Sequence, residues 1–128
     1  STPLYSSAAS DVYKRQLYSH LDSRRNSDNE LEPYVIIETT VPRNVYESID
    51  HVELLYANSS SGFWTSLGKH KLSSGKYYYI DTVAPEIAAN KIKYALVGRN
   101  YSMETVFSTI TLDINLKTYN YIETSTAI

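Results

Sequence analysis

The 128-residue chain has no cysteine, and glycine (4), proline (4), methionine (1) and tryptophan (1) are scarce. Without cysteine, disulfides and thiolate metal sites are excluded, which fits a cytosolic protein and equally a bacterial surface protein. Four glycines leave little room for a phosphate-binding loop, and the sequence contains no Gly-x-Ser-x-Gly nucleophile motif. No apolar run approaches the ~18 residues of a membrane span, so we expect no membrane insertion.

The charge of the chain is nearly balanced, with a formal net charge of −2 at pH 7 and no block of like charges. A protein that binds nucleic acid by neutralising phosphates needs a basic surface, so we expect no nucleic-acid partner. The histidines at positions 20, 51 and 70 are not in His-x-x-x-His or His-Glu-x-x-His spacing. The carboxylates show no pairing that suggests acid–base catalysis. We therefore expect no enzyme activity, no metal site and no cofactor.

Residues 1–16, STPLYSSAASDVYKRQ, resemble the in-frame translation of a sequencing-library adapter. Residues 11–16 are similar to a transposase mosaic end, residues 6–10 to a read-primer site, and residues 1–5 to an index with its flank. A segment of this kind is excluded from fold reasoning. We expect the natural part to be a fragment of a longer protein from environmental DNA, joined to further domains of the same chain.

Residues 17–32 are polar and charged without a clear period, which predicts a linker or a disordered segment. Residues 33–125 are then expected to form the folded domain. Strands are predicted over residues 34–41, 52–57, 91–97, 103–114 and 117–124. Residues 63–72 and 76–82 flank a Ser-Ser-Gly turn at hairpin spacing, and residues 84–90 favour a single helical turn.

The hydrophobic pattern within these segments indicates which residues face the core. In residues 91–97 the alternation predicts that three side chains point inward: Ile92, Tyr94 and Leu96. The long segment 103–114 predicts a bend near its middle and one face that holds Val106, Ser108, Ile110, Leu112 and Ile114. About seven short strands with turns between them predict an all-β fold, an antiparallel immunoglobulin-like β-sandwich.

Tyrosine is unusually frequent, with thirteen residues against two phenylalanines and one tryptophan. Most are expected to pack in the core or across strands. Near predicted loops stand Trp64, Tyr101 and Tyr46. Rings on the loops of a sandwich can stack on the apolar face of a pyranose, and the amides of Asn58 and Asn100 could bond its hydroxyls. For Trp64 the alternative is a core position, as in immunoglobulin-type folds.

Four stretches in this order carry a family resemblance: residues 44–46 (NVY), residues 51–57 (HVELLYA), Trp64, and residues 92–101 (IKYALVGRNY). Together they resemble the family 21 carbohydrate-binding modules, the starch- and glycogen-binding sandwiches of amylolytic enzymes and of glycogen-targeting phosphatase subunits. The resemblance covers residues 34–114 and implies that Trp64, Tyr46 and Tyr101 stack on sugar. The family usually has an Asp-Asn-Asn-like run after the late tyrosine, where this chain has Ser-Met-Glu-Thr at residues 102–105.

Two functions therefore follow from the sequence. The leading hypothesis is a non-catalytic carbohydrate-binding module that binds an α-glucan polysaccharide such as starch or glycogen. The alternative is a structural or adhesive immunoglobulin-like module of a surface or secreted protein, without a sugar site. Exposure of Trp64 and Tyr101 on one surface would favour the first hypothesis, and burial of both rings the second.

Overall fold

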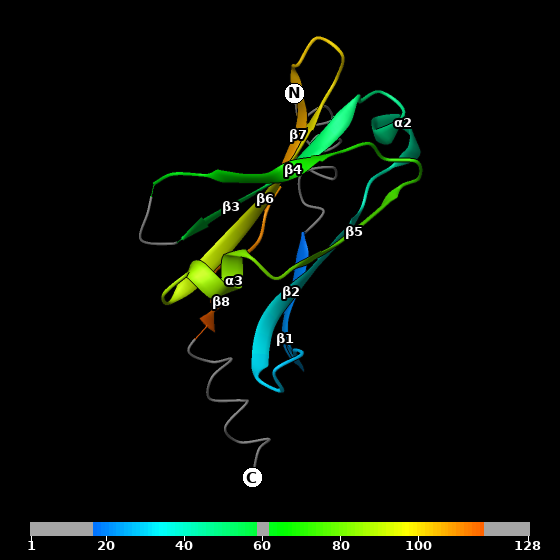
Figure 1. Ribbon diagram of the computed structural model, residues 1–128. Helices are drawn as coiled ribbons and strands as arrows, with labels where there is room; N and C mark the ends of the chain where they lie inside the picture. The colour runs from blue at the N-terminus through cyan, green and yellow to red at the C-terminus, as the bar shows by residue number, and fades with distance from the viewer. Residues whose placement is uncertain (1–16, 59–61, 117–128) are drawn as a thin grey trace.

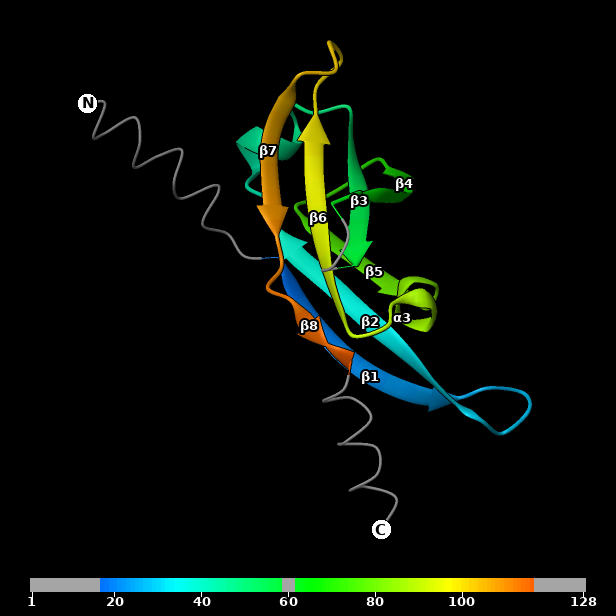
Figure 2. The same ribbon diagram turned by 90° about the vertical axis from the view of Figure 1, so that its left-hand side faces the viewer.

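The computed structural model describes residues 17–58 and 62–116. Over these residues the chain forms two antiparallel sheets around one core, which confirms the predicted all-β sandwich (Figures 1 and 2). The three-stranded sheet has the order β1-β2-β5, and the five-stranded sheet has the order β4-β3-β6-β7 with β8 also paired to β6. The strands are β1 (Tyr18–Arg25), β2 (Leu31–Thr40), β3 (His51–Asn58), β4 (Thr65–His70), β5 (Lys76–Asp81), β6 (Lys91–Arg99), β7 (Thr105–Ile110) and β8 (Ile114–Asn115).

The first strand, β1, lies in the segment expected to be a linker, so that prediction was wrong. It pairs with β2 along its whole length, from Tyr18 opposite Glu38 to Arg25 opposite Leu31. The polar run after β1 is the loop of this hairpin: the side-chain oxygen of Asn26 accepts bonds from the backbone N–H groups of Asp28 and Glu30. The strand carries little hydrophobic alternation because its outer face is largely polar and its inner face mixes leucine with serine.

Strands β4 and β5 belong to different sheets, so the predicted hairpin around Ser73, Ser74 and Gly75 was also wrong. Strand β4 pairs with β3, and β5 pairs with β2. The turn between them carries the chain from one sheet to the other, and the N–H of Val41 donates to the Gly75 carbonyl at 2.6 Å. A Cβ at Gly75 would lie 2.6 Å from the Val41 carbonyl oxygen, so glycine allows this close approach.

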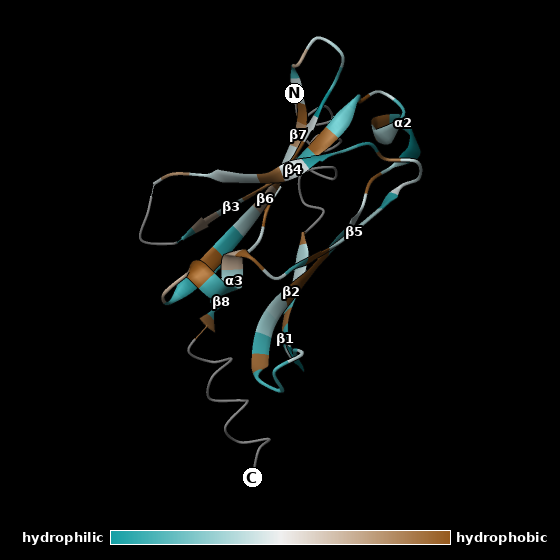
Figure 3. Ribbon diagram, viewed as in Figure 1, coloured by the Kyte–Doolittle hydropathy of each residue, from teal (hydrophilic) through white to brown (hydrophobic). Residues whose placement is uncertain are grey.

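The core lies between the two sheets and is built from alternating residues of both. Ile92, Tyr94 and Leu96 are fully buried on β6, which confirms their predicted inward direction. The Tyr94 hydroxyl donates to Asp81 at 2.8 Å and so joins β6 of one sheet to β5 of the other. Burial and the neighbouring Asp81 carboxylate raise the pKa of Tyr94. Figure 3 shows hydrophobic and hydrophilic stretches alternating along β2 and β6.

Two short helices interrupt the strands. The first, α2 (Arg43–Tyr46), connects β2 to β3, and the second, α3 (Ala84–Ile87), confirms the predicted helical turn after β5. The predicted strand over residues 103–114 is divided into β7 and β8. Its buried residues are Phe107, Thr109 and Thr111, whereas Ile110 and Leu112 of the predicted face are exposed. The predicted strand over residues 117–124 lies outside the described residues, as does the adapter-like segment. In the part of the chain that the structure describes, no helix is long and apolar enough to cross a membrane.

Candidate functional site

The five candidate residues occupy three separate places in the fold. Asn58 and Trp64 lie where β3 ends and β4 is about to begin, and Asn100 and Tyr101 lie in the turn between β6 and β7. Tyr46 lies on α2. Asn100 and Tyr101 therefore lie together in one turn. Asn58 and Trp64 lie at the same end of the β3–β6 pair but on opposite faces of the sheet, since Asn58 is paired with Ile92, whereas the Trp64 ring lies at Lys93, which is paired with Ala57.

Trp64 lies at the surface, so the core position considered for it is excluded. Its side chain is 39% exposed, and the ring of the preceding Phe63 is 83% exposed. The Lys93 ammonium of β6 lies 5.4 Å from the centroid of the Trp64 ring, a cation–π contact that orients the indole. Two large rings that face solvent side by side in the chain are available for contact with a ligand.

Phe63 lies beside a shallow groove of about 210 Å³. Tyr56 and Asn58 from β3 line one part of it, and Ile87 and Ala88 from the end of α3 line another. Trp64 and Lys93 do not line this groove. We call the groove residues Tyr56, Asn58, Phe63 and Ile87, together with the neighbouring Trp64–Lys93 pair, the Trp64 surface. Sequence reasoning missed Phe63, although its position next to Trp64 in a polar loop was a signal for it. It also missed Ile87, because no local pattern indicates that α3 packs beside this loop.

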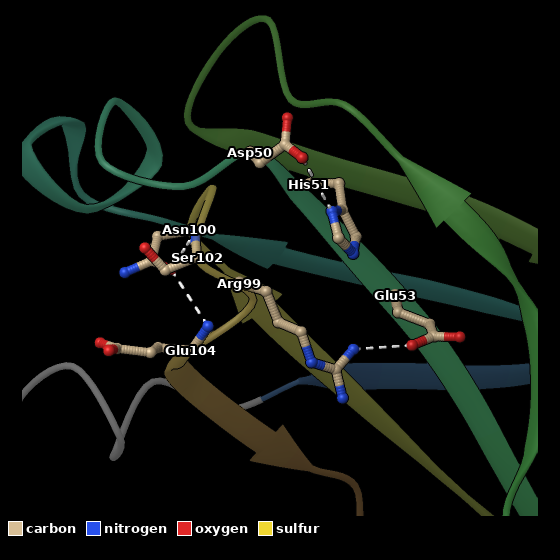
Figure 4. Close-up of polar contacts among 7 residues, drawn as sticks. All are labelled: Asp50, His51, Glu53, Arg99, Asn100, Ser102 and Glu104. Carbon is tan, nitrogen blue, oxygen red and sulfur yellow. Dashed lines mark hydrogen bonds and ion pairs between the residues drawn. The ribbon is translucent and has the colours of Figure 1, made fainter.

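The turn between β6 and β7, residues 100–104, is closed by its own polar groups (Figure 4). We call it the Asn100 turn. The side-chain oxygen of Asn100 accepts bonds from the backbone N–H groups of Ser102, at 3.0 Å, and Glu104, at 3.1 Å. Met103 takes a positive φ of 67°, which the compact turn requires. The Asn100 oxygen thus holds the loop together, while the neighbouring Tyr101 ring is 76% exposed.

Charged side chains support the sheet beside the Asn100 turn. Arg99 donates to Glu53 at 2.7 Å (Figure 4). The Ser66 hydroxyl donates to the other Glu53 oxygen at 2.8 Å. The bonds from Ser66 and from the Arg99 guanidinium lower the pKa of Glu53 and outweigh the opposing effect of burial. His51 faces Asp50 at 3.5 Å. Glu53, Arg99 and Ser66 thus partner one another, whereas the buried Nε2 of His51 has no hydrogen-bond partner among the described residues.

The Trp64 surface and the Asn100 turn lie at opposite ends of the β3–β6 pair. Ala57 is paired with Lys93 at one end, and His51 is paired with Arg99 at the other. Six residues of extended strand between Lys93 and Arg99 correspond to roughly 20 Å. A single short sugar therefore cannot contact Trp64 and Tyr101 together.

Tyr46 is the least available of the predicted stacking residues. Its side chain is partly buried and packs against the hydrophobic core. Its ring also lies against Gly75, where a Cβ would come within 3.5 Å of it. Its position supports the crossover between the sheets rather than an open binding face.

Comparison of the chain with protein-family models, with curated proteins and with solved structures finds no match. The class of the protein is therefore defined by its fold, an antiparallel β-sandwich with exposed aromatic residues at both ends of the β3–β6 pair.

Proposed function

We propose that the chain is a non-catalytic carbohydrate-binding module whose ligand is an α-glucan such as starch or glycogen. The observation that carries this proposal is the exposed Phe63 ring in a groove that Asn58 also lines, with the exposed Trp64 ring next to Phe63 in the chain but outside the groove. The apolar C–H face of a glucose unit packs on such a ring, and its hydroxyl groups bond amide groups at the edge.

The geometry of the Trp64 surface supports a binding role in two further ways. The Lys93 ammonium over the Trp64 ring restrains the indole before a ligand arrives, which lowers the entropy lost on binding. The same ammonium carries N–H donors for sugar hydroxyls. The groove is shallow and open, which suits a polymer that lies along a surface more than a small molecule that is enclosed.

The proposal places the primary site at Asn58, Phe63 and Trp64. Tyr101 is exposed but stands roughly 20 Å away along the strands. Asn100 and Tyr46 support the fold in this proposal and bind no sugar.

The test is retention of the full chain on insoluble starch, with calorimetric titration of soluble amylose beside it. We expect Trp64→Ala and Phe63→Ala each to weaken binding about tenfold or more, since a stacked ring at the centre of a contact supplies much of its energy. Tyr101→Ala is the matched control, because it also removes an exposed aromatic ring. Thermal melts of all variants show whether the fold is intact. No retention of the parent chain, or equal retention of Trp64→Ala, would refute the proposal.

A second candidate function is favoured by the apolar character of the same surface. Phe63 and Ile87 are both exposed and border one groove, which also suits a protein partner in a structural or adhesive module. If the chain has that function, it should not be retained on starch, and its apparent mass in sedimentation should rise with protein concentration. Loss of this dependence in Phe63→Ala would establish it in place of sugar binding.

A further inference from the structure

The outer face of the three-stranded sheet presents cross-strand rows of side chains to solvent. Residues opposite one another in an antiparallel pair point to the same face, so the strand register defines each row. Tyr18 of β1 lies opposite Glu38 of β2, and Glu38 lies opposite Tyr78 of β5. This register places one carboxylate between two tyrosines that are far apart in the chain.

The row is open to solvent and forms a groove. Tyr18 is 60% exposed and Tyr78 is 59% exposed, and Glu38 between them is exposed as well. The groove holds about 270 Å³, and Lys76 also lines it. We call it the Tyr18–Tyr78 groove. It lies on a different sheet from the Trp64 surface, so it is a separate site.

The opposite end of the same face is closed by contacts within the protein. Arg24 forms an ion pair with Glu32 at 3.0 Å and lies 5.5 Å from the centroid of the Tyr34 ring. The Tyr34 hydroxyl donates to Asp22 at 3.3 Å. Glu38, by contrast, has no ion pair within residues 17–58 and 62–116. The tyrosines and the carboxylate of the groove therefore remain available to a ligand.

The spacing of the two tyrosines fits one flat ring. Their Cα atoms are two strand spacings apart, which is roughly 9.6 Å. A ring that stacks on both tyrosines needs two van der Waals contacts, together about 7–8 Å. Because Glu38 lies in the same row between the two tyrosines, a pyranose ring that contacts both would lie over the Glu38 side chain.

The charges in the groove decide between a cation and a neutral ligand. Two tyrosines with one carboxylate could hold a quaternary ammonium group. Lys76 lines the same groove, however, and its positive charge would repel a cation and partly neutralise Glu38. A neutral ligand with many hydroxyl groups can donate to Glu38 and accept from Lys76, and so uses both groups.

We propose that the Tyr18–Tyr78 groove is a second sugar-binding subsite, which takes one pyranose unit between Tyr18 and Tyr78 with its hydroxyls on Glu38 and Lys76. The inference rests on the proposed function for the type of ligand, but on other residues and on the other sheet. A chain with both sites contacts a polysaccharide at two points, which strengthens retention on a polymer more than on a short sugar.

The experiment is a titration of the isotope-labelled full chain with maltoheptaose, followed by NMR at each backbone amide. We expect shifts at the strand residues around Tyr18, Glu38 and Tyr78 as well as at the Trp64 surface. Tyr78→Ala should weaken the response of the groove about tenfold and leave the response of the Trp64 surface unchanged. Tyr78→Phe keeps the ring and is the matched control, since it should retain most of the affinity. Glu38→Gln should reduce it less than Tyr78→Ala.

The outcomes separate the two proposals. Shifts at the Trp64 surface alone overturn the second subsite and leave the proposed function standing. Shifts at the groove alone, with none at the Trp64 surface of the parent chain, support the subsite and overturn the primary site. Shifts at neither place overturn both. A titration with tetramethylammonium is the remaining arm: if that cation shifts the groove residues and maltoheptaose does not, the sugar assignment is wrong.

Discussion

The two ends of the β3–β6 pair carry similar residues but differ in what those residues do. The Asn100 turn has an asparagine followed by an exposed tyrosine, and the Trp64 surface has an asparagine, a tryptophan and a phenylalanine. At the turn the Asn100 oxygen accepts two backbone bonds. At the Trp64 surface the Phe63 ring lines a groove, and the Lys93 ammonium lies over the Trp64 ring outside that groove.

The difference teaches that residue type alone does not identify a binding site. In the sequence, Asn100 fits the role of an amide that binds sugar. In the structure, its side-chain oxygen accepts hydrogen bonds from two backbone N–H groups that the tight turn would otherwise leave without a partner. Removing a group of this kind should change stability, whereas removing an exposed ring should leave stability nearly unchanged. Each of the predictions below sets a residue of one end against a matched residue elsewhere.

The largest expected effect is a difference in stability between two glycine substitutions, one near each end of the β3–β6 pair. A Cβ at Gly98, near the Asn100 turn, would clash with the Phe107 ring, whereas a Cβ at Gly62, near Trp64, would have nothing within 4 Å. We therefore expect Gly98→Ala to lower the free energy of unfolding by about 1–3 kcal/mol, since the buried ring must move. Gly62→Ala should stay within about 0.5 kcal/mol. Urea unfolding of both variants is the measurement, and equal losses would contradict the comparison.

A smaller effect is expected within the Asn100 turn itself. Asn100→Ala removes the acceptor of two backbone N–H groups and should cost about 1 kcal/mol of stability. Tyr101→Ala at the next position removes an exposed ring and should change stability by less than about 0.5 kcal/mol. Thermal melts of the two variants test this order. A larger loss for Tyr101→Ala would show that its ring packs on the fold and stabilises the turn more than the Asn100 side chain does.

The smallest effect concerns the pH dependence of the Glu53–Arg99 pair. The pKa of Glu53 is lowered in the folded protein, so its contribution to stability is present above the ordinary glutamate pKa and is lost as the pH falls through the lowered value. Glu53→Gln should cost at most about 1 kcal/mol at pH 7. It should also lose less stability than the parent chain below about pH 4.3.

Melting temperatures at neutral and acid pH measure this difference. Glu104→Gln is the control, because Glu104 is an exposed glutamate on the neighbouring turn. An acid loss in Glu53→Gln as large as in the parent chain would show that other carboxylates account for it.

Local pattern was enough for the strands that cross the core. The alternation on either side of Tyr94 predicted both a strand and its buried face, because successive strand residues point to opposite sides. It was not enough for β1, whose outer face is polar, or for β4 and β5, which looked like a hairpin. Which strands pair is decided by contacts between distant segments, and a turn sequence such as Ser73-Ser74-Gly75 fits a hairpin and a crossover equally well.

For the candidate site, too, local signals could be predicted from the sequence and contacts between separate elements could not. Trp64 and Asn58 were found from the sequence because a lone tryptophan after a polar loop is a local signal. Ile87 and the row of Tyr18, Glu38 and Tyr78 were not, because their members come from separate elements. Nor could the sequence show that Tyr101 stands at the far end of the sheet from Trp64.

By itself the sequence determined the β class, the inner face of β6 and the helical turn α3, since each depends on the spacing of residues along one segment. Only the tertiary structure decided that Trp64 is exposed, that the Asn100 oxygen is already bonded, and that Tyr18 and Tyr78 flank Glu38. Burial, hydrogen-bond partners and cross-strand neighbours depend on which distant segments meet, and that pairing is a property of the whole fold.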